Sequence, residues 1–154
     1  MRGAQEQMPS EFGKAPRSGW AKMLSELHVN DLDRSLFFWG EILGFAVAYQ
    51  RPTERFVYLE HAEGHQIMLC QRHGRFETGA LEYPLGQGAM FQIYLQDLEP
   101  ILARLRSKNW TIYLGPREVW RQVGDQEFGQ REVFVQDPDG YLIMLAENVG
   151  KRPN

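Results

Sequence analysis

The sequence predicts an α+β fold made of two tandem β-α-β-β-β modules in one domain. Three observations predict it: the chain repeats its own pattern, each repeat opens with an alternating strand and an amphipathic helix, and each continues with short strands between turn residues. At 154 residues the chain is long enough for one domain with a substantial core.

The repeat is visible in two pairs of segments. Residues 27–43 (LHVNDLDRSLFFWGEIL) match residues 93–109 (IYLQDLEPILARLRSKN) at an offset of 66. Residues 67–69 match residues 143–145, both reading IML, at an offset of 76. One insertion of 10 residues in the second copy (76 − 66) reconciles the offsets. Equivalent positions of a doubled unit can meet around a shared pocket, so their residue types bear on function.

The domain boundaries follow from composition. Residues 1–20 show no hydrophobic period and are rich in Gly, Pro and charge, which predicts a flexible N-terminal arm before a domain at residues 21–150. The modules cover about residues 22–71 and 89–148, because the segment between them, residues 72–88, contains four Gly and one Pro.

In the first module, residues 23–29 alternate as a strand. A helix follows, because Leu32, Leu36, Trp39 and Leu43 fall on one helical face and Asn30 or Asp31 can cap it. Gly44 ends this helix. Three further strands are expected near residues 45–50, 55–60 and 65–71.

The second module repeats this order. A strand is expected at residues 90–96, and a helix runs from Leu98 to about Lys108 with Pro100 in its first turn. Asp137-Pro138-Asp139-Gly140 has the composition of a tight turn, to which we assign a structural role. Strands are expected near residues 110–114, 118–123, 131–136 and 141–146, one more than in the first module because of the insertion.

Composition excludes several classes of partner. The net charge is −3 and no basic run is present, so neither nucleic acid nor an anionic membrane is expected to bind. No apolar stretch reaches the roughly 18 residues of a membrane span. No apolar segment typical of a signal peptide is seen, and Cys70 is the only cysteine, so a reducing cytoplasm is the expected location.

The paired motifs carry a resemblance. VNDLDRSLFFWGEILGF (residues 29–45) and EFGQREVFVQDPDGYLIML (residues 127–145) resemble the vicinal oxygen chelate superfamily, over roughly residues 22–148. That family includes glyoxalase I, extradiol dioxygenases, thiol transferases acting on fosfomycin, and bleomycin-resistance proteins. The resemblance implies two curved sheets that form a cup, and in the family's enzymes the cup encloses a divalent metal.

The resemblance also implies four metal-ligand positions, on the first and last strand of each module. Here these positions hold Leu24, Met68, Met90 and Met144. Zn, Mn, Fe and Ni sites require imidazole or carboxylate, so no metal, no other cofactor and no catalytic residue is expected. Three thioethers could suit Cu(I), but Met more commonly fills apolar space and adapts to varied ligands. In lacking these metal ligands the chain resembles the bleomycin-resistance branch, whose members bind their drug without modifying it.

Strand alternation predicts the other residues that face the pocket. Leu24 brings Glu26 and His28 to its face, Met90 brings Gln92 and Tyr94, Met68 brings Gln66 and Cys70, and Met144 brings Leu142. Leu27, Val29, Ile93 and Leu95 have the opposite parity and should face the helices. Phe56 and Trp120 are the strand aromatics expected to stack on flat groups of a ligand. The predicted ligand-binding residues are Leu24, Glu26, His28, Phe56, Met68, Met90, Gln92, Tyr94, Trp120 and Met144.

The sequence leaves several alternatives open. Glu26 could simply pair with an arginine, His28 could be a structural histidine, and Gln92 and Tyr94 could satisfy one another. The function expected first is sequestration of a bleomycin-type glycopeptide antibiotic by a homodimer. The second is a superfamily enzyme, a lyase or dioxygenase, with ligands relocated to residues such as Glu26, His28 and Glu60. The third is binding of another small aromatic compound.

Overall fold

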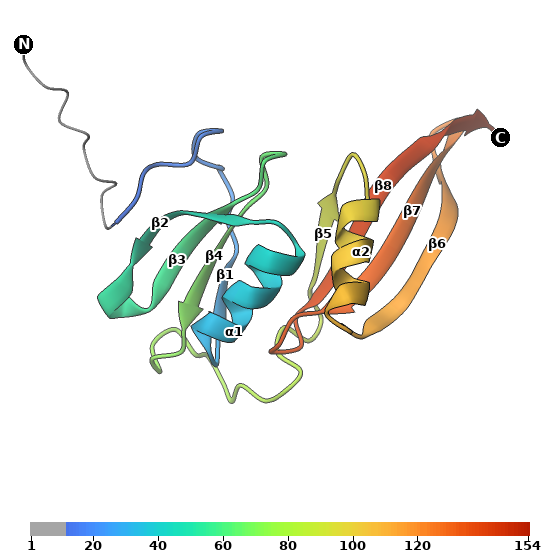
Figure 1. Ribbon diagram of the computed structural model, residues 1–154. Helices are drawn as coiled ribbons and strands as arrows, with labels where there is room; N and C mark the ends of the chain where they lie inside the picture. Colours follow the sequence, from blue (N-terminus) through green and yellow to red (C-terminus); the bar gives the residue numbers. More distant parts are fainter. Residues whose placement is uncertain (1–11) are drawn as a thin grey trace, which may run out of the picture. The chain divides into compact units, whose positions relative to one another are not determined.

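The computed structural model describes residues 12–154 and confirms the α+β class (Figure 1). The chain divides into two compact units. The described part of the first consists of residues 12–32 and 45–72, and the second consists of residues 33–44 and 73–154. Each unit contains one four-stranded mixed sheet, and the strand order of the two sheets is equivalent. The doubled β-α-β-β-β order is therefore confirmed.

The first sheet contains β1 (Glu26–Val29), β2 (Ala46–Arg51), β3 (Phe56–Glu60) and β4 (Gln66–Gln71) in the order β1-β4-β3-β2. β1 is parallel to β4, and the other neighbours are antiparallel. A short 3-10 turn, η2 (Pro52–Glu54), joins β2 to β3. On β1, β3 and β4 one face of the sheet is apolar and buried, as the alternation predicts. Its members are Leu27, Val29, Val57, Leu59, Ile67 and Leu69.

The N-terminal arm requires a correction. We expected residues 1–20 to be flexible; residues 1–11 lie outside the described residues, but residues 12–20 are docked on the first unit. Gly13 forms a bridge with Tyr49 of β2, and the backbone N–H of Lys14 donates to the carbonyl of Ala48 at 2.9 Å. The segment therefore pairs with the open edge of β2. Main-chain hydrogen bonds hold it there, so its docking does not require a hydrophobic pattern in its sequence.

The side chain of Gln66 on β4 holds the other end of this segment. Its amide nitrogen donates to Ser18 Oγ at 2.9 Å and to the carbonyl of Gly19 at 2.6 Å. Its oxygen accepts from the backbone N–H of Ala21 at 3.1 Å and from the hydroxyl of Tyr58. We call residues 12–20 the strap.

The predicted first helix begins as an α-helix, α1 (Leu32–Leu36), and continues as a π-helix, η1 (Phe37–Ile42). The N–H of Leu43 donates to the carbonyl of Phe38, five residues earlier, at 3.0 Å. This wider turn accompanies the burial of Phe38, Trp39 and Ile42. Gly44 then ends the helix with φ of +86°, as expected for a residue without Cβ.

This helix does not group with the strands that flank it in sequence. Residues 33–44 belong to the second compact unit, where Arg104 Nε donates to the carbonyl of Ile42 at 2.7 Å. The rings of Phe38 and Trp110 also pack at 5.1 Å between centroids. The boundary between the sequence modules is therefore not the boundary between the compact units.

The second sheet contains β5 (Met90–Tyr94), β6 (Ile112–Val123), β7 (Gln126–Gln136) and β8 (Leu142–Pro153) in the order β5-β8-β7-β6. The helix α2 (Glu99–Ser107) lies where the sequence predicts it, with Pro100 in its first turn (Figure 1). It buries Ile101, Leu102 and Leu105, and the face of the sheet with Ile93, Val133, Val135, Ile143 and Leu145 is buried too.

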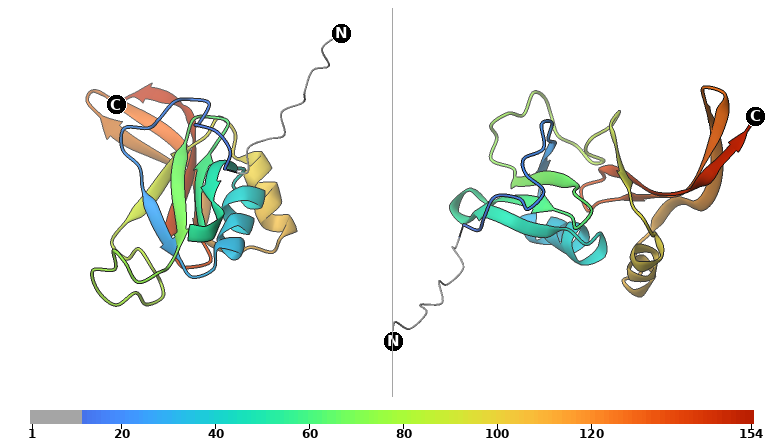
Figure 2. Two further views of the ribbon diagram at one scale, coloured as in Figure 1. Left: turned by 90° about the vertical axis from the view of Figure 1, so that its left-hand side faces the viewer. Right: turned by 90° about the horizontal axis from the view of Figure 1, so that it is seen from above.

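The insertion in the second module does not add a strand. The two strands expected at residues 110–114 and 118–123 form one long strand, β6, with register irregularities between Ile112 and Arg117. These irregularities absorb extra residues, so the insertion lengthens the hairpin of β6 and β7 instead. Figure 2 shows this hairpin projecting past α2.

The turn Asp137–Gly140 has the structural role expected of it. The N–H of Gly140 donates to the carbonyl of Asp137 at 3.0 Å, and Gly140 has φ of +93°. The carboxylate of Asp137 is buried and accepts hydrogen bonds from the N–H groups of Asp139 and Tyr141. Trp39 Nε1 adds a third bond at 3.2 Å, so the turn also fixes the first helix within this unit.

Candidate functional site

The second face of the first sheet carries polar, sulfur and aromatic side chains in rows that cross all four strands. One row consists of Glu26, Met68, Tyr58 and Tyr49, and the next consists of His28, Cys70, Phe56 and Arg51. We call this the mixed face of the first sheet. It contains the side chains that alternation assigned to a pocket.

The polar end of this face is the pair Glu26 and His28. Glu26 Oε2 and His28 Nε2 lie 3.2 Å apart, and the side chain of Glu26 is 35% exposed. The two residues are therefore placed together on β1, with a carboxylate that a ligand can reach. Beside them, Leu24 and Met68, which the sequence predicts as part of an apolar floor, pack on a cluster formed by Phe56, Tyr58 and Cys70.

Aromatic rings cover the far side of the mixed face. Tyr49 and Tyr58 stack with 4.9 Å between centroids. Trp20 of the strap meets both edge-on, at 5.8 Å from Tyr49 and 5.5 Å from Tyr58, and remains 60% exposed. Phe56, predicted as a stacking wall, is buried beneath the guanidinium of Arg51, whose Cζ lies 4.7 Å from its centroid. Trp20 is thus the most exposed of these rings.

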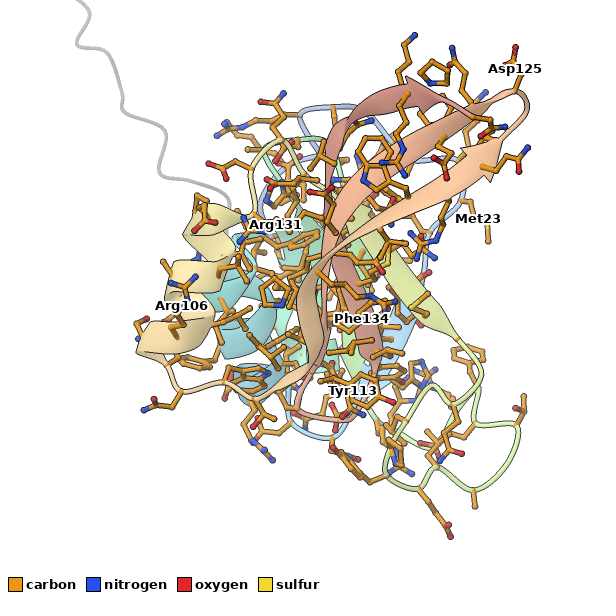
Figure 3. The ribbon with its side chains drawn as sticks, turned by 90° about the vertical axis from the view of Figure 1, so that its right-hand side faces the viewer. Met23, Arg106, Tyr113, Asp125, Arg131 and Phe134 are labelled. Atoms are coloured by element: carbon orange, nitrogen blue, oxygen red, sulfur yellow. The ribbon has the colours of Figure 1, made fainter. Side chains whose placement is uncertain are left out.

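The second sheet has an equivalent mixed face. One row consists of Gln92, Met144, Phe134 and Leu114, and the next consists of Tyr94, Ala146, Glu132 and Arg117. Figure 3 shows Phe134 near the middle of this sheet and Asp125 at the tip of the β6–β7 hairpin. The rows correspond to those of the first sheet, with Glu132 in the place of Phe56 and Arg117 in the place of Arg51.

The most strongly connected polar group on this face is Glu132, whose side chain has no exposed surface. Arg121 binds it with two nitrogens at 3.1 Å each, and Arg117 Nε donates at 3.0 Å. Gln130 Nε2 donates at 2.6 Å. Burial alone would raise the pKa of Glu132, but the hydrogen bonds from Arg121, Gln130 and Arg117 outweigh it and lower the pKa. We call these four residues the Glu132 cluster.

Two of the predicted polar residues lie beside this cluster. Tyr94 shares a row with Glu132, and its hydroxyl donates to Gln92 Oε1 at 3.0 Å. The two side chains do contact one another, as considered from the sequence, but Tyr94 stays 49% exposed and is open to a ligand. Met90 lies in the row next to that of Gln92 and is also exposed.

Trp120 is not placed with the other predicted residues. Trp120 pairs with Gly129, and Arg117 pairs with Glu132, with no irregularity between the two pairs. Side chains alternate between the faces of a strand, and an odd number of residues separates Trp120 from Arg117. Trp120 therefore projects from the opposite face of the second sheet. There its Nε1 donates to Glu118 at 2.8 Å, and the guanidinium of Arg152 lies 4.2 Å from the ring centroid. The face on which each β6 side chain lies could not be assigned from the sequence, because the register irregularities between Ile112 and Arg117 interrupt the alternation.

The four positions that the fold would use for metal ligands do not fit a divalent cation. Leu24 and Met68 belong to the apolar cluster of the first sheet. Met144 is 2% exposed and packs with Phe134 and Ala146. Among residues 12–154, no group of three or more His, Cys, Asp or Glu side chains is arranged to hold a metal ion.

Several residues of the two mixed faces were not predicted from the sequence: Trp20, Tyr49, Arg117, Arg121, Gln130 and Glu132. The signal for Glu132 was available, because the offset of 76 that relates the modules places it over Phe56, a residue assigned to the pocket. No comparable signal marked Trp20, since it lies in a segment without periodicity.

Comparisons with known proteins agree with the doubled fold. The family model "Glyoxalase/Bleomycin resistance protein/Dioxygenase superfamily" matches residues 23–145. A probable lactoylglutathione lyase of Synechocystis sp. is 28% identical over 135 residues, which cover 82% of this chain and 94% of that protein. A lactoylglutathione lyase of Arabidopsis thaliana is 27% identical over 122 residues, 77% of this chain but only 41% of the plant enzyme.

Among solved structures, virulence protein STM3117 from Salmonella typhimurium has a TM-score of 0.59 and 24% identity, covering 82% of this chain and 94% of that one. This likeness shows the fold. The class of protein is an α+β fold of two β-α-β-β-β modules whose sheets have equivalent mixed faces. The chain belongs to the glyoxalase/bleomycin resistance protein/dioxygenase superfamily. No helix in residues 12–154 is long and apolar enough to cross a membrane.

Proposed function

We propose that this protein binds a small aromatic ligand and releases it unaltered, and that the ligand is a bleomycin-type glycopeptide antibiotic. The observation that carries the proposal is the replacement of the four metal-ligand positions by Leu24, Met68, Met90 and Met144. An apolar floor in place of a metal is suited to holding a ligand and not to polarising it.

The mixed face of the first sheet supports the ligand class. Glu26 supplies an exposed carboxylate that would attract cationic groups of such a drug. Trp20 and Tyr49 supply rings at the other end of the same face, on which planar heteroaromatic groups would stack. Because Phe56 is covered by Arg51, we assign the stacking role to Trp20 instead.

A second candidate is a glyoxalase-like enzyme, because the named relatives from Synechocystis and Arabidopsis are lactoylglutathione lyases. It would need relocated metal ligands such as Glu26, His28 and Glu60. Glu26 and His28 are adjacent, but Glu60 pairs with Gln66 in another row and accepts the N–H of Arg17 at 2.7 Å. The described residues do not bring these three together, which favours binding without chemistry.

Incubation with bleomycin tests the proposal directly. We expect saturable binding by calorimetry, and mass spectrometry of the drug after long incubation should show an unchanged mass. A parallel incubation with the glutathione hemithioacetal of methylglyoxal, with and without added Zn or Ni, tests the enzyme. Covalent change of the drug or conversion of the hemithioacetal would contradict a purely binding function. Absence of bleomycin binding at high micromolar drug would remove the ligand assignment.

We also propose a cytoplasmic location for the protein. Cys70 is the only cysteine of the sequence and is buried, so an intrachain disulfide cannot form, which is compatible with a reducing cytoplasm. Measuring the protein in cell fractions tests this.

A further inference from the structure

We propose that the mixed face of the second sheet carries a subsite for an organic oxyanion, a carboxylate or phosphate ester joined to an apolar group. The subsite consists of Arg117 and Arg121 of β6, which the buried carboxylate of Glu132 holds in place. It goes beyond the proposed function, because it lies on the other sheet and takes a ligand group of opposite charge.

The charges of the Glu132 cluster do not cancel. Two guanidinium groups meet one carboxylate, and among the residues that the structure describes the ion pairs of Arg117 and Arg121 go to Glu132 alone. The lowered pKa of Glu132 keeps that carboxylate ionised at neutral pH. Two positive charges and one negative charge leave one positive charge uncompensated on this face.

The two arginine side chains are exposed to solvent, whereas the side chain of Glu132 is not. The side chain of Glu132 is 0% exposed, whereas Arg117 is 45% and Arg121 is 49% exposed. An approaching anion therefore meets the guanidinium groups and not the carboxylate. Arg121 uses Nη1 and Nη2 on Glu132, and Arg117 uses Nε and Nη2. Within the described residues this leaves the Nε–H of Arg121 and the Nη1 group of Arg117 for a ligand.

The guanidinium groups are also fixed before a ligand arrives. Arg121 is held by a two-point contact with Glu132, and Arg117 lies against the ring of Phe134, with its Cζ 5.5 Å from the centroid. A flexible arginine loses rotamer entropy on binding an anion, and these two have already lost it. A buried carboxylate that immobilises two exposed arginines is an arrangement suited to oxyanion recognition.

The surroundings specify what else the ligand carries. Tyr94 lies in the row of Glu132, Leu114 lies in the next row, and Phe128 pairs with Arg121 on the same face. All three side chains are exposed. An oxyanion at the arginines would therefore have apolar and aromatic surface beside it, so an arene carboxylate or aryl phosphate fits better than a free inorganic ion.

A matched set of small probes tests this on the full chain at constant ionic strength. Benzoate and phenyl phosphate supply the two kinds of oxyanion, and benzamidine supplies a cation of the same shape. We expect benzoate or phenyl phosphate to bind saturably, with shifts of arginine Nε–H signals in NMR spectra, and benzamidine not to bind. The ratio of the two anion affinities identifies which oxyanion the subsite prefers.

Variants locate the site. Arg121→Gln and Arg117→Gln should each weaken anion binding by about tenfold or more, the size of one hydrogen bond to a charged group. Arg152→Gln is the control, because it removes the same charge from the opposite face of this sheet, where Arg152 pairs with Glu127. It should leave anion affinity unchanged.

Arg121→Lys covers the case in which Arg121→Gln fails to fold, since it keeps the positive charge next to Glu132. It should bind benzoate more weakly than the wild type because lysine lacks the planar fork. Equal affinity for benzoate and benzamidine would overturn the proposal. So would unchanged anion affinity in the folded Arg121 variants, or an equal loss in Arg152→Gln.

Discussion

Trp39 Nε1 donates a hydrogen bond to Oδ2 of Asp137 at 3.2 Å, across 98 residues of sequence. The helix of the first module is thereby attached to the last turn of the second, inside one compact unit. Asp137 is buried, and burial raises its pKa to about 6. The neighbouring carboxylate of Asp139 also raises it, and the hydrogen bonds from Trp39 and the turn offset only part of the effect.

This relationship predicts a pH dependence of stability. The ordinary pKa of Asp is 3.8 and the folded value is about 6, so the folded state binds the proton more tightly. The resulting stabilisation is complete below about pH 4 and is lost as pH rises through about 6, a change of about 3 kcal/mol. Asp137→Asn should lack this component, so its destabilisation relative to the wild type should be larger at pH 4 than at pH 7.

Urea unfolding at pH 4, 5 and 7 measures the difference. Asp125→Asn, which alters an exposed aspartate at the tip of the β6–β7 hairpin, is the control and should show no such trend. A constant difference between wild type and Asp137→Asn across this range would contradict the assignment.

Gly13 is predicted to be required for docking of the strap. It has φ of +86°, and an added Cβ would lie 2.3 Å from the carbonyl oxygen of Ala48. Gly13→Ala should therefore release residues 12–20 and speed tryptic cleavage after Lys14 and Arg17. Gly64→Ala is the matched control, because its φ is +92° but the space around it is open. The docking would be refuted if both variants resisted trypsin as the wild type does.

Glu26 is predicted to contribute to drug binding through its charge. Glu26→Gln keeps the shape and should weaken bleomycin binding by about 1–3 kcal/mol, less at high salt because the side chain is partly exposed. Glu54→Gln removes the same charge from the turn between β2 and β3 and should have little effect. Isothermal titration at two salt concentrations gives both comparisons, and equal losses in the two variants would argue against a role for Glu26.

The purified protein is predicted to contain no stoichiometric divalent metal, because Leu24, Met68, Met90 and Met144 offer no imidazole or carboxylate. Elemental analysis should find less than one equivalent of Zn, Ni, Fe or Mn. A chelator should leave the melting temperature unchanged. One bound equivalent, lost together with stability on chelation, would show that other residues bind a metal.

A homodimer is predicted in solution. β6 is an edge strand of 12 residues, and its side chains Tyr113, Leu114 and Val123 are exposed. A second copy would cover such an edge, which is otherwise open to aggregation. Sedimentation at micromolar concentration should give twice the monomer mass, and a monomer there would contradict the prediction.

The sequence by itself determined which side of the first and last strand of each module is apolar and which is mixed. Alternation is a local property, so Leu27 and Val29 could be assigned to the buried face, and Glu26 and His28 to the other, without knowledge of strand pairing. The repeat determined the order of the elements and the equivalence of Glu26 with Gln92. The residues at the four positions that the resemblance to the superfamily assigns to metal ligands could also be read directly, as Leu24, Met68, Met90 and Met144.

Only the tertiary structure decided the rest, because those features depend on register and on contacts distant in sequence. The irregular register of β6 turns Trp120 away and brings Arg117 and Arg121 onto Glu132. Main-chain pairing docks the strap and places Trp20 against Tyr58. No pattern of side chains in the sequence predicts this docking. Trp39 reaches Asp137 because burial requires a partner for each polar atom, and that partner lies in the other module.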